Sequence, residues 1–198
     1  MTPRTVEYIA WVVWYVSWGL AALWATPAAK RPGLRAQWPN LTVTTVGAAM
    51  LFLPAGRGGV LTLRLWQASG VPAWSCVGVT ILGFSFCWWA RVHLGALWSG
   101  TVTIKRDHRL VDSGPYGLVR HPIYTGILAA AVGLVGLGGA PSGLLGLVLV
   151  TLGFAMKARL EEDILKSALG AAAYDAYAAR TPMLIPWPWR ALKRRSDP

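Results

Sequence analysis

Residues 122–156 form the feature that most constrains the fold, because these 35 positions contain no charged side chain. A helix that crosses a bilayer needs about 20 consecutive apolar residues, so this run is too long for one crossing. Gly138-Gly139-Ala140-Pro141 interrupts it with residues that favour a tight turn. The run therefore predicts a helical hairpin within the membrane, with helices at about 122–137 and 142–158.

The composition of the whole chain agrees with a membrane protein. Of its 198 residues, 55% are hydrophobic and only 14% are charged, whereas a soluble domain is about one-quarter charged. This hydrophobicity excludes a disordered chain, and two cysteines are too few for a disulfide scaffold. Cys76 and Cys87 lie 11 positions apart in one apolar segment, roughly 16 Å along a helix, and so are not expected to bridge each other.

Three further apolar segments precede the hairpin. They cover residues 8–25, 41–55 and 71–90, and the helix of the third is expected to continue to Trp98. The first is too long and too rich in Trp for a signal peptide, so it is interpreted as a retained span. The predicted fold is an all-α integral membrane bundle of about five transmembrane helices. It forms one membrane domain, 1–198, with three N-terminal spans in 1–90 and a second half in 91–198 that contains the hairpin and the C-terminal helix.

The distribution of Lys and Arg gives an orientation for these five spans. With five crossings, sixteen of the nineteen basic residues fall on one side of the membrane. The other three are Arg4, Arg57 and Arg64. By the positive-inside rule, the N-terminus is outside and the C-terminus is cytoplasmic, in the inner (cytoplasmic) membrane. The net charge of +11 then reflects topology and contact with anionic membrane lipids rather than nucleic-acid binding.

The chain changes character after Met156. Residues 157–180 are rich in charge, with apolar side chains at helical spacing, which predicts one helix that leaves the membrane and follows its cytoplasmic face. Pro182, Pro186 and Pro188 are expected to end it. Trp187 and Trp189 suit the headgroup region, and 190–198 resembles a frayed basic tail.

Polar residues gather at the two ends of the hairpin. Arg120 and His121 immediately precede Pro122, which suits the first turn of a helix, where free N–H groups favour an anion. Glu161 and Glu162 follow the second hairpin helix and return to the same membrane depth. These groups are either a ligand site or, as the alternative, an interfacial anchor and a solvated acidic surface.

Two other patterns in the chain involve residues that can take part in ligand or metal binding. Gly114-Pro115-Tyr116-Gly117 is either an ordinary turn or a loop whose backbone approaches a ligand. His93, His108 and His121 lack the spacing of a metal site, so no metal is predicted.

Residues 110–126 resemble the central motif of the isoprenylcysteine carboxyl methyltransferases. The shared pattern is Gly-Pro-Tyr followed by Arg-His-Pro-x-Tyr-x-Gly, here Gly114 to Gly126. The Glu161–Glu162 pair and the segment from Gly170 to Pro186 are similar to the C-terminal part of that family. Phospholipid N-methyltransferases are relatives with a similar Glu-Glu pair.

This resemblance implies an integral membrane methyltransferase that uses S-adenosylmethionine and releases S-adenosylhomocysteine. The cofactor-binding residues that it implies are Gly114, Pro115, Tyr116, Val119, His121, Tyr124 and Glu161. The catalytic residues that it implies are Arg120, Glu162 and Arg180, with either glutamate meeting the amino group of the cofactor or orienting Arg120. The methyl acceptor is expected to be a lipophilic or lipid-linked molecule, a carboxylate being one option. No sequence feature indicates the oligomeric state.

Two other functions stay open at this point. An NADPH-dependent membrane reductase of the sterol-reductase type shares a similar Arg-His-Pro-x-Tyr segment. There the glycine is usually followed by Glu, whereas here Gly126 is followed by Ile127, which favours the methyltransferase. A small transporter is expected to place charges near the middle of the membrane, and this chain concentrates them at the ends of its spans.

Overall fold

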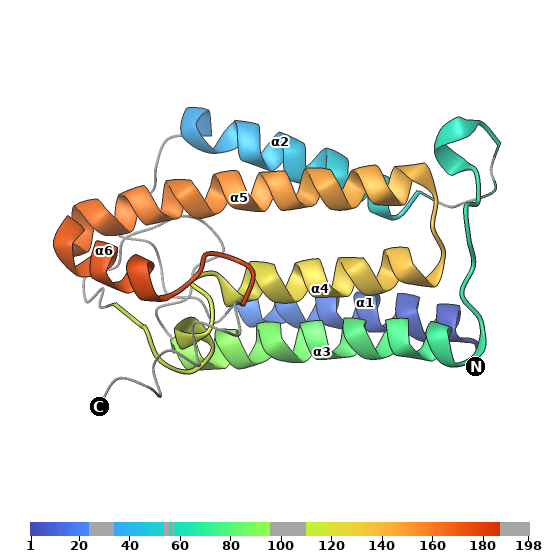
Figure 1. Cartoon of the computed structure of the whole chain (residues 1–198), viewed down its shortest axis with the longest axis horizontal. Helices are drawn as coiled ribbons and strands as arrows, with labels where there is room; N and C mark the ends of the chain where they lie inside the picture. The colour runs from blue at the N-terminus through green and yellow to red at the C-terminus, as the bar shows by residue number, and fades with distance from the viewer. Residues whose placement is uncertain (24–33, 54–55, 57, 96–109, 187–198) are drawn as a thin grey trace.

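The computed structural model describes residues 1–23, 34–53, 56, 58–95 and 110–186. Within them the chain forms six α-helices and two short 3-10 helices, and no strand occurs in this part of the chain (Figure 1). The α-helices are α1 (Pro3–Ala22), α2 (Leu34–Leu51), α3 (Gly70–Leu94), α4 (Pro122–Leu137), α5 (Pro141–Leu169) and α6 (Ala171–Arg180). The 3-10 helices are η1 (Val60–Thr62) and η3 (Gly114–Gly117). The prediction of an all-α fold is confirmed.

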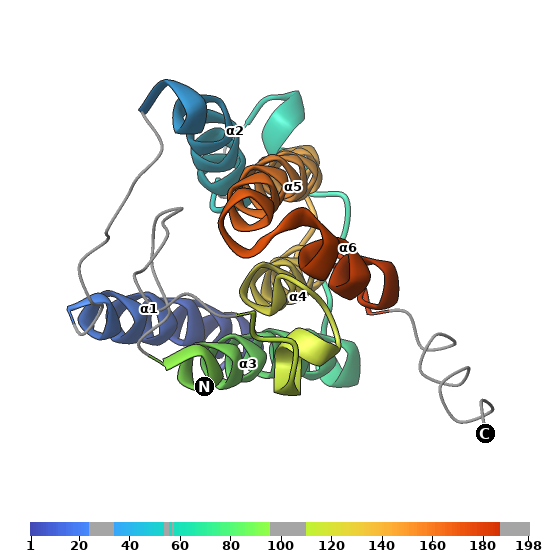
Figure 2. The same cartoon turned by 90° about the vertical axis from the view of Figure 1, so that its left-hand side faces the viewer.

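The α4–α5 hairpin forms the centre of the molecule. Helices α1 and α3 lie along one side of it, with α3 packed against α4, and α2 lies along the other side against α5 (Figures 1 and 2). Helix α6 folds back from the end of α5, at the end of the bundle opposite the hairpin turn (Figure 1). This arrangement brings the start of α4 and the last turns of α5 to one end of the bundle.

Small residues let these helices approach closely. A Cβ atom on Gly83 of α3 would lie 2.5 Å from the carbonyl oxygen of Gly126 on α4. A Cβ on Gly146 of α5 would lie 2.6 Å from the backbone nitrogen of Leu51 on α2. In lipid the hydrophobic effect does not favour contact between helices, and close packing over small residues is one of the interactions that hold them together.

The outer faces of the bundle are apolar. Val12 and Val13 on α1, Leu82 on α3 and Leu152 on α5 are each more than half exposed. By length and composition, α3 and α5 can each cross a membrane, and α4 is a shorter apolar helix. A membrane protein is therefore supported, whereas crossing by all five long helices stays a prediction.

The hairpin has the predicted form, with α4 at Pro122–Leu137 and Pro141 in the first turn of α5. Three other predicted boundaries are wrong. Helix α3 ends at Leu94 rather than at Trp98, because Gly95 adopts a left-handed φ of 54°. Helix α2 starts at Leu34, ahead of the predicted 41, and contains Pro39. Helix α1 starts at Pro3, where the Thr2 side chain accepts a hydrogen bond from the Thr5 amide.

The predicted single helix over 157–180 is also wrong. Helix α5 continues without interruption to Leu169, and Gly170, with a φ of 89°, then turns the chain into α6. A positive φ is readily adopted by glycine, which makes Gly170 the break between the two helices. Several predicted features lie outside the described residues. They are Lys30, Arg31, Arg57, Lys105, Arg106, His108, Arg109, Trp187, Pro188, Trp189 and the basic tail.

Candidate functional site

The residues just before α4 and those near the end of α5 form one polar cluster. We call Arg120, His121, Tyr124, Glu161 and Glu162 the hairpin cluster. His121 is the residue before the helix and Pro122 its first residue, as the sequence predicts. The two glutamates lie on α5 beyond the predicted membrane span, so the return of the hairpin brings side chains about 40 positions apart into contact.

Arg120 makes the most extensive set of polar contacts in the hairpin cluster. Its Nε donates to Glu162 Oε1 at 2.8 Å and its Nη2 to Glu162 Oε2 at 3.2 Å, a bidentate ion pair. Its Nη1 donates to the carbonyl oxygens of Ala178 at 3.1 Å and Thr181 at 2.6 Å. The side chains of both partners in the ion pair are about one-tenth exposed. Arg120 therefore ties α5 to the end of α6.

His121 lies between the two glutamates. Its Nε2 is 3.0 Å from Glu162 Oε1, and its Nδ1 is 3.4 Å from Glu161 Oε2. Burial alone would lower the pKa of His121, but the hydrogen bonds and negative charge of Glu161 and Glu162 outweigh it and raise the pKa. The protonated ring is thus favoured, and with Arg120 it balances the two carboxylates.

Tyr124 completes the hairpin cluster one turn along α4. Its hydroxyl donates to Glu161 Oε1 at 2.7 Å. Its ring stacks on the imidazole of His121, with centroids 5.5 Å apart, and on Phe154 of α5 at 4.8 Å. Lys157 Nζ lies 5.3 Å from the centroid of the same ring. These contacts fix the position of the hydroxyl beside Glu161.

The segment after α6 binds back onto the start of α4. The backbone N–H of Arg120 donates to Pro182 O at 2.8 Å and that of His121 to Met183 O at 3.1 Å. The Thr125 hydroxyl donates to Leu184 O at 2.5 Å. We call residues 181–184 the C-terminal strap. Sequence reasoning missed its contacts with Thr125, and the only signal was that Leu184 to Pro186 resembles the C-terminal segment of the family.

The loop before α4 packs beside this cluster. Pro115, Tyr116 and Val119 are buried, and Tyr116 O accepts a hydrogen bond from the Tyr177 hydroxyl at 2.6 Å. Gly114 has a φ of 56°, and a Cβ there would lie 2.8 Å from the His93 ring. This close approach requires glycine. The loop of the predicted cofactor site thus contacts α6 through Tyr116 and α3 through Gly114.

Arg180 is placed differently from Arg120. Its guanidinium forms an ion pair with Asp112, and its side chain is 49% exposed. It also lies over the Tyr177 ring, 5.9 Å from the centroid. The structure therefore does not join Arg180 directly to the hairpin cluster, and its catalytic role stays a prediction.

No metal site is evident in the part of the chain that the structure describes, where no group of three or more His, Cys, Asp and Glu side chains is placed to hold an ion. His93 instead lies 3.0 Å from the Ser113 hydroxyl through Nε2. Cys76 and Cys87 are free thiols on α3, as predicted.

The geometry agrees with a comparison against protein families. Residues 76–167 match the model of the isoprenylcysteine carboxyl methyltransferase (ICMT) family. The predicted resemblance to the ICMT family is confirmed. The matched segment includes the loop 114–119 and the whole hairpin cluster, and it ends before α6, Arg180 and the C-terminal strap.

Two curated relatives match about half of the chain. The "Cobalt-zinc-cadmium resistance protein CzcN" of Cupriavidus metallidurans is 36% identical over 98 residues, which are 47% of this chain and 43% of that protein. The "Nickel-cobalt-cadmium resistance protein NccN" of Alcaligenes xylosoxydans xylosoxydans is 32% identical over 98 residues, 47% of this chain and 44% of that protein. The match thus covers less than half the length of each relative.

Proposed function

We propose that the chain transfers a methyl group from S-adenosylmethionine to a lipophilic acceptor held in the membrane. The observation that carries the proposal is the hairpin cluster, which joins cationic and anionic side chains at the end of an apolar bundle, within the segment matched to the ICMT family. The family match supports a relationship to methyltransferases, and helices α3 and α5, which are long and apolar enough to cross a bilayer, support a membrane protein.

The residues present fit the amino-acid end of this cofactor, which carries an ammonium and a carboxylate. Glu161 and Glu162 supply acceptors for the ammonium, and the protonated ring of His121, whose two nitrogens face these glutamates, supplies positive charge near the carboxylate. The loop 114–119, where Gly114 lies against the His93 ring, gives a closely packed wall beside them. When bound, the cofactor supplies a methyl group on a positively charged sulfur.

The two glutamates differ in how fully they are engaged. Glu162 receives Arg120 through two nitrogens and lies 3.0 Å from His121 Nε2, and its side chain is 10% exposed. Glu161 accepts a hydrogen bond from Tyr124 at 2.7 Å and lies farther from His121, at 3.4 Å from Nδ1, and its side chain is 21% exposed. We therefore assign Glu161 to the cofactor ammonium and Glu162 to the positioning of Arg120 and His121.

Arg120 has few N–H groups left with which to bind the methyl acceptor. A guanidinium has five N–H donors, and four hydrogen bonds to Glu162, Ala178 and Thr181 use most of them. A carboxylate methyl acceptor would then be held by Arg180. The present partner of Arg180, Asp112, is exposed, so a substrate carboxylate can take its place. Such an acceptor is already ionised at neutral pH and needs no general base, whereas an amine would need to lose a proton.

The place of the site in the membrane is part of the proposal. The positive-inside rule puts the hairpin cluster at the cytoplasmic face and the N-terminus outside. A water-soluble cofactor would reach the cluster from the cytoplasm, and a greasy acceptor would reach it laterally from the bilayer. The partners proposed are therefore a lipophilic or lipid-linked substrate and membrane lipids.

Calorimetric titration of the purified protein with S-adenosylhomocysteine, and separately with NADPH, tests this function. We expect S-adenosylhomocysteine to bind and Glu161→Gln to weaken that binding about tenfold, because one charge-assisted hydrogen bond in a partly exposed site is lost. Asp163→Asn, an exposed acid two positions away, is the matched control and should bind as the parent does. Binding of NADPH without S-adenosylhomocysteine would favour the reductase instead.

A further inference from the structure

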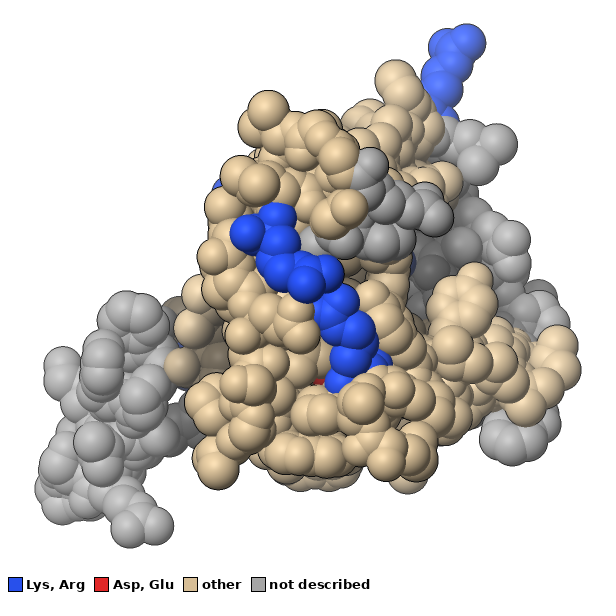
Figure 3. All heavy atoms as spheres, turned by 90° about the vertical axis from the view of Figure 1, so that its right-hand side faces the viewer, with Lys and Arg blue, Asp and Glu red and all other residues tan. Residues whose placement is uncertain are grey.

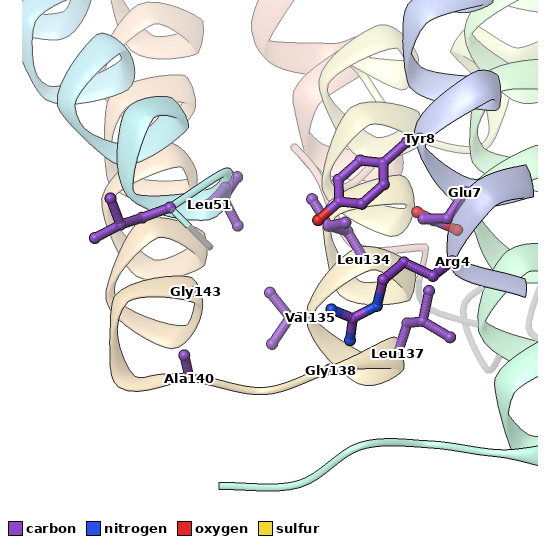
Figure 4. Close-up of a pocket in the computed structure, with 11 residues that line it drawn as sticks. Arg4, Glu7, Tyr8, Leu51, Leu134, Val135, Leu137, Gly138, Ala140 and Gly143 are labelled. Carbon is purple, nitrogen blue, oxygen red and sulfur yellow. The ribbon is translucent and has the colours of Figure 1, made fainter. Parts of the chain in front are cut away.

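A pocket lies at the opposite end of the bundle from the hairpin cluster, beside the α4–α5 turn (Figure 4). Helix α1 contributes Arg4, Glu7 and Tyr8 to its wall. Helices α2 and α4 contribute apolar side chains, among them Leu51, Leu134 and Leu137. We call it the α1 pocket. None of its lining residues belongs to the site described above.

Glu7 is a fully buried acid in the wall of this pocket, with an exposed fraction of 0%. Its Oε1 accepts from Trp11 Nε1 at 3.0 Å and from the Thr80 hydroxyl at 2.7 Å. Its Oε2 is buried and has no hydrogen-bond partner among the described residues. A buried acid with an unsatisfied oxygen in an apolar bundle is costly and points to a ligand that satisfies it. What this oxygen lacks is a donor, such as an ammonium group.

Arg4 lies one turn before Glu7, and its guanidinium reaches the hairpin turn at Gly138 (Figure 4). It forms no hydrogen bond or ion pair with any residue that the structure describes. Arg64 belongs to the segment that pairs with the same turn, where the Leu65 N–H donates to Gly139 O at 2.9 Å. Figure 3 shows basic side chains crossing this end of the molecule as a stripe. The stripe offers positive charge to an anion at the mouth of the pocket.

We propose that the α1 pocket binds a membrane lipid with a phosphoethanolamine headgroup. Its phosphate lies at Arg4, with Arg64 on the approach, its ammonium at Glu7, and part of an acyl chain against Leu51 and Leu134. Arg4 and Glu7 are three residues apart, about 4.5 Å along a helix, and ethanolamine links its two charges through only two carbons.

Glu7 selects among headgroups that share this phosphate. A quaternary choline ammonium has no N–H to donate to Oε2. A glycerol headgroup brings no positive charge to balance the carboxylate beside Arg4. The site is thus built for a zwitterion with a primary ammonium, because Arg4 and Glu7 line the same pocket and present one charge of each sign.

Native mass spectrometry of the detergent-purified protein, titrated with dioctanoyl phosphatidylethanolamine, phosphatidylcholine and phosphatidylglycerol, tests the proposal. We expect the ethanolamine lipid to bind about tenfold more tightly than the other two, the effect of one additional charge-assisted bond. Glu7→Gln should remove this preference while phospholipids still bind. Arg4→Gln should weaken the ethanolamine and choline lipids together. Arg35→Gln, which changes an exposed arginine on the first turn of α2, is the control and should change neither.

Equal affinity for the ethanolamine and choline lipids in the parent protein would overturn the proposal, as would tighter binding of the glycerol lipid. If Glu7→Gln does not fold, Arg4→Gln still tests the proposal. Unchanged phospholipid binding by Arg4→Gln would show that the lipid phosphate does not bind at Arg4. The proposal does not depend on methyl transfer. Binding of S-adenosylhomocysteine to Arg4→Gln should match that of the parent, so failure of one proposal leaves the other intact.

Discussion

Replacement of Glu162 by Gln should destabilise the protein strongly. Glu162 forms a bidentate ion pair with Arg120, and His121 Nε2 lies 3.0 Å from the same carboxylate. Gln keeps the shape but removes the charge, which leaves Arg120 as a buried cation without its partner. Breaking a buried ion pair on one side costs about 3–5 kcal/mol. Since Arg120 retains the carbonyls of Ala178 and Thr181, we expect a loss near the lower end, about 3 kcal/mol.

Thermal melting of the purified protein in one detergent measures this loss. For a chain of this size, 1 kcal/mol corresponds to about 2–4 °C, so Glu162→Gln should melt roughly 6–12 °C below the parent. The adjacent Asp163 is exposed, and Asp163→Asn should stay within about 0.5 kcal/mol of the parent. A melting temperature of Glu162→Gln equal to that of Asp163→Asn would refute the view that this ion pair holds α4, α5 and α6 together.

A double-mutant cycle separates the pair from its surroundings. Arg120→Gln alone leaves Glu162 buried beside one remaining cation, whereas the double variant Arg120→Gln with Glu162→Gln leaves no uncompensated charge between them. The double variant should therefore be more stable than the sum of the single effects predicts. Strictly additive losses would mean that the two side chains act independently.

Three further predictions concern other parts of the chain. The pKa of His121 is raised in the folded protein, so its contribution to stability is complete below the ordinary histidine pKa of about 6.5 and is lost as the pH rises through the raised value. In melting curves from pH 6 to 9, the melting temperature of the parent should show this fall, and that of His121→Gln should not. Arg180→Lys should lower methyl transfer to a surrogate lipid acid by roughly tenfold or more while S-adenosylhomocysteine affinity, measured by calorimetry, changes little; equal turnover would remove Arg180 from the acceptor site. A reporter inserted at Gly139 should be external and one fused after Arg195 cytoplasmic, and a cytoplasmic Gly139 would invert the proposed topology.

The hairpin and the pairing of its ends could be predicted because they depend on local signals. The uncharged run, the Gly138–Pro141 turn and Pro122 fix where α4 begins and ends and where α5 begins. Once the hairpin is accepted, its geometry returns Glu161 and Glu162 to the depth of Arg120 and His121. That return predicts contact between a glutamate and Arg120, whereas the structure is needed to show that Glu162 is the partner.

The parts that the sequence did not reveal depend on non-local contacts. The partner of Arg180 is Asp112, 68 positions earlier, and no periodicity links the two. The carbonyls that bind Arg120 come from the end of α6 and the start of the C-terminal strap, whose path depends on the turn at Gly170. Glycine permits such a turn but does not require it, which is why residues 157–180 read as one continuous helix.

The polar contacts at the end of the bundle opposite the hairpin turn suggest how one small chain combines stability with a ligand site. Glu162 is buried and fully engaged, and it connects α4, α5 and α6 through Arg120. Glu161, on the next position of the same helix, faces Tyr124 and keeps more contact with solvent. Adjacent positions on a helix point about 100° apart, so two identical side chains are directed to different surroundings. The Glu-Glu pair thus separates a carboxylate that holds the fold from one that is available to a ligand, and the two Gln variants measure that division independently.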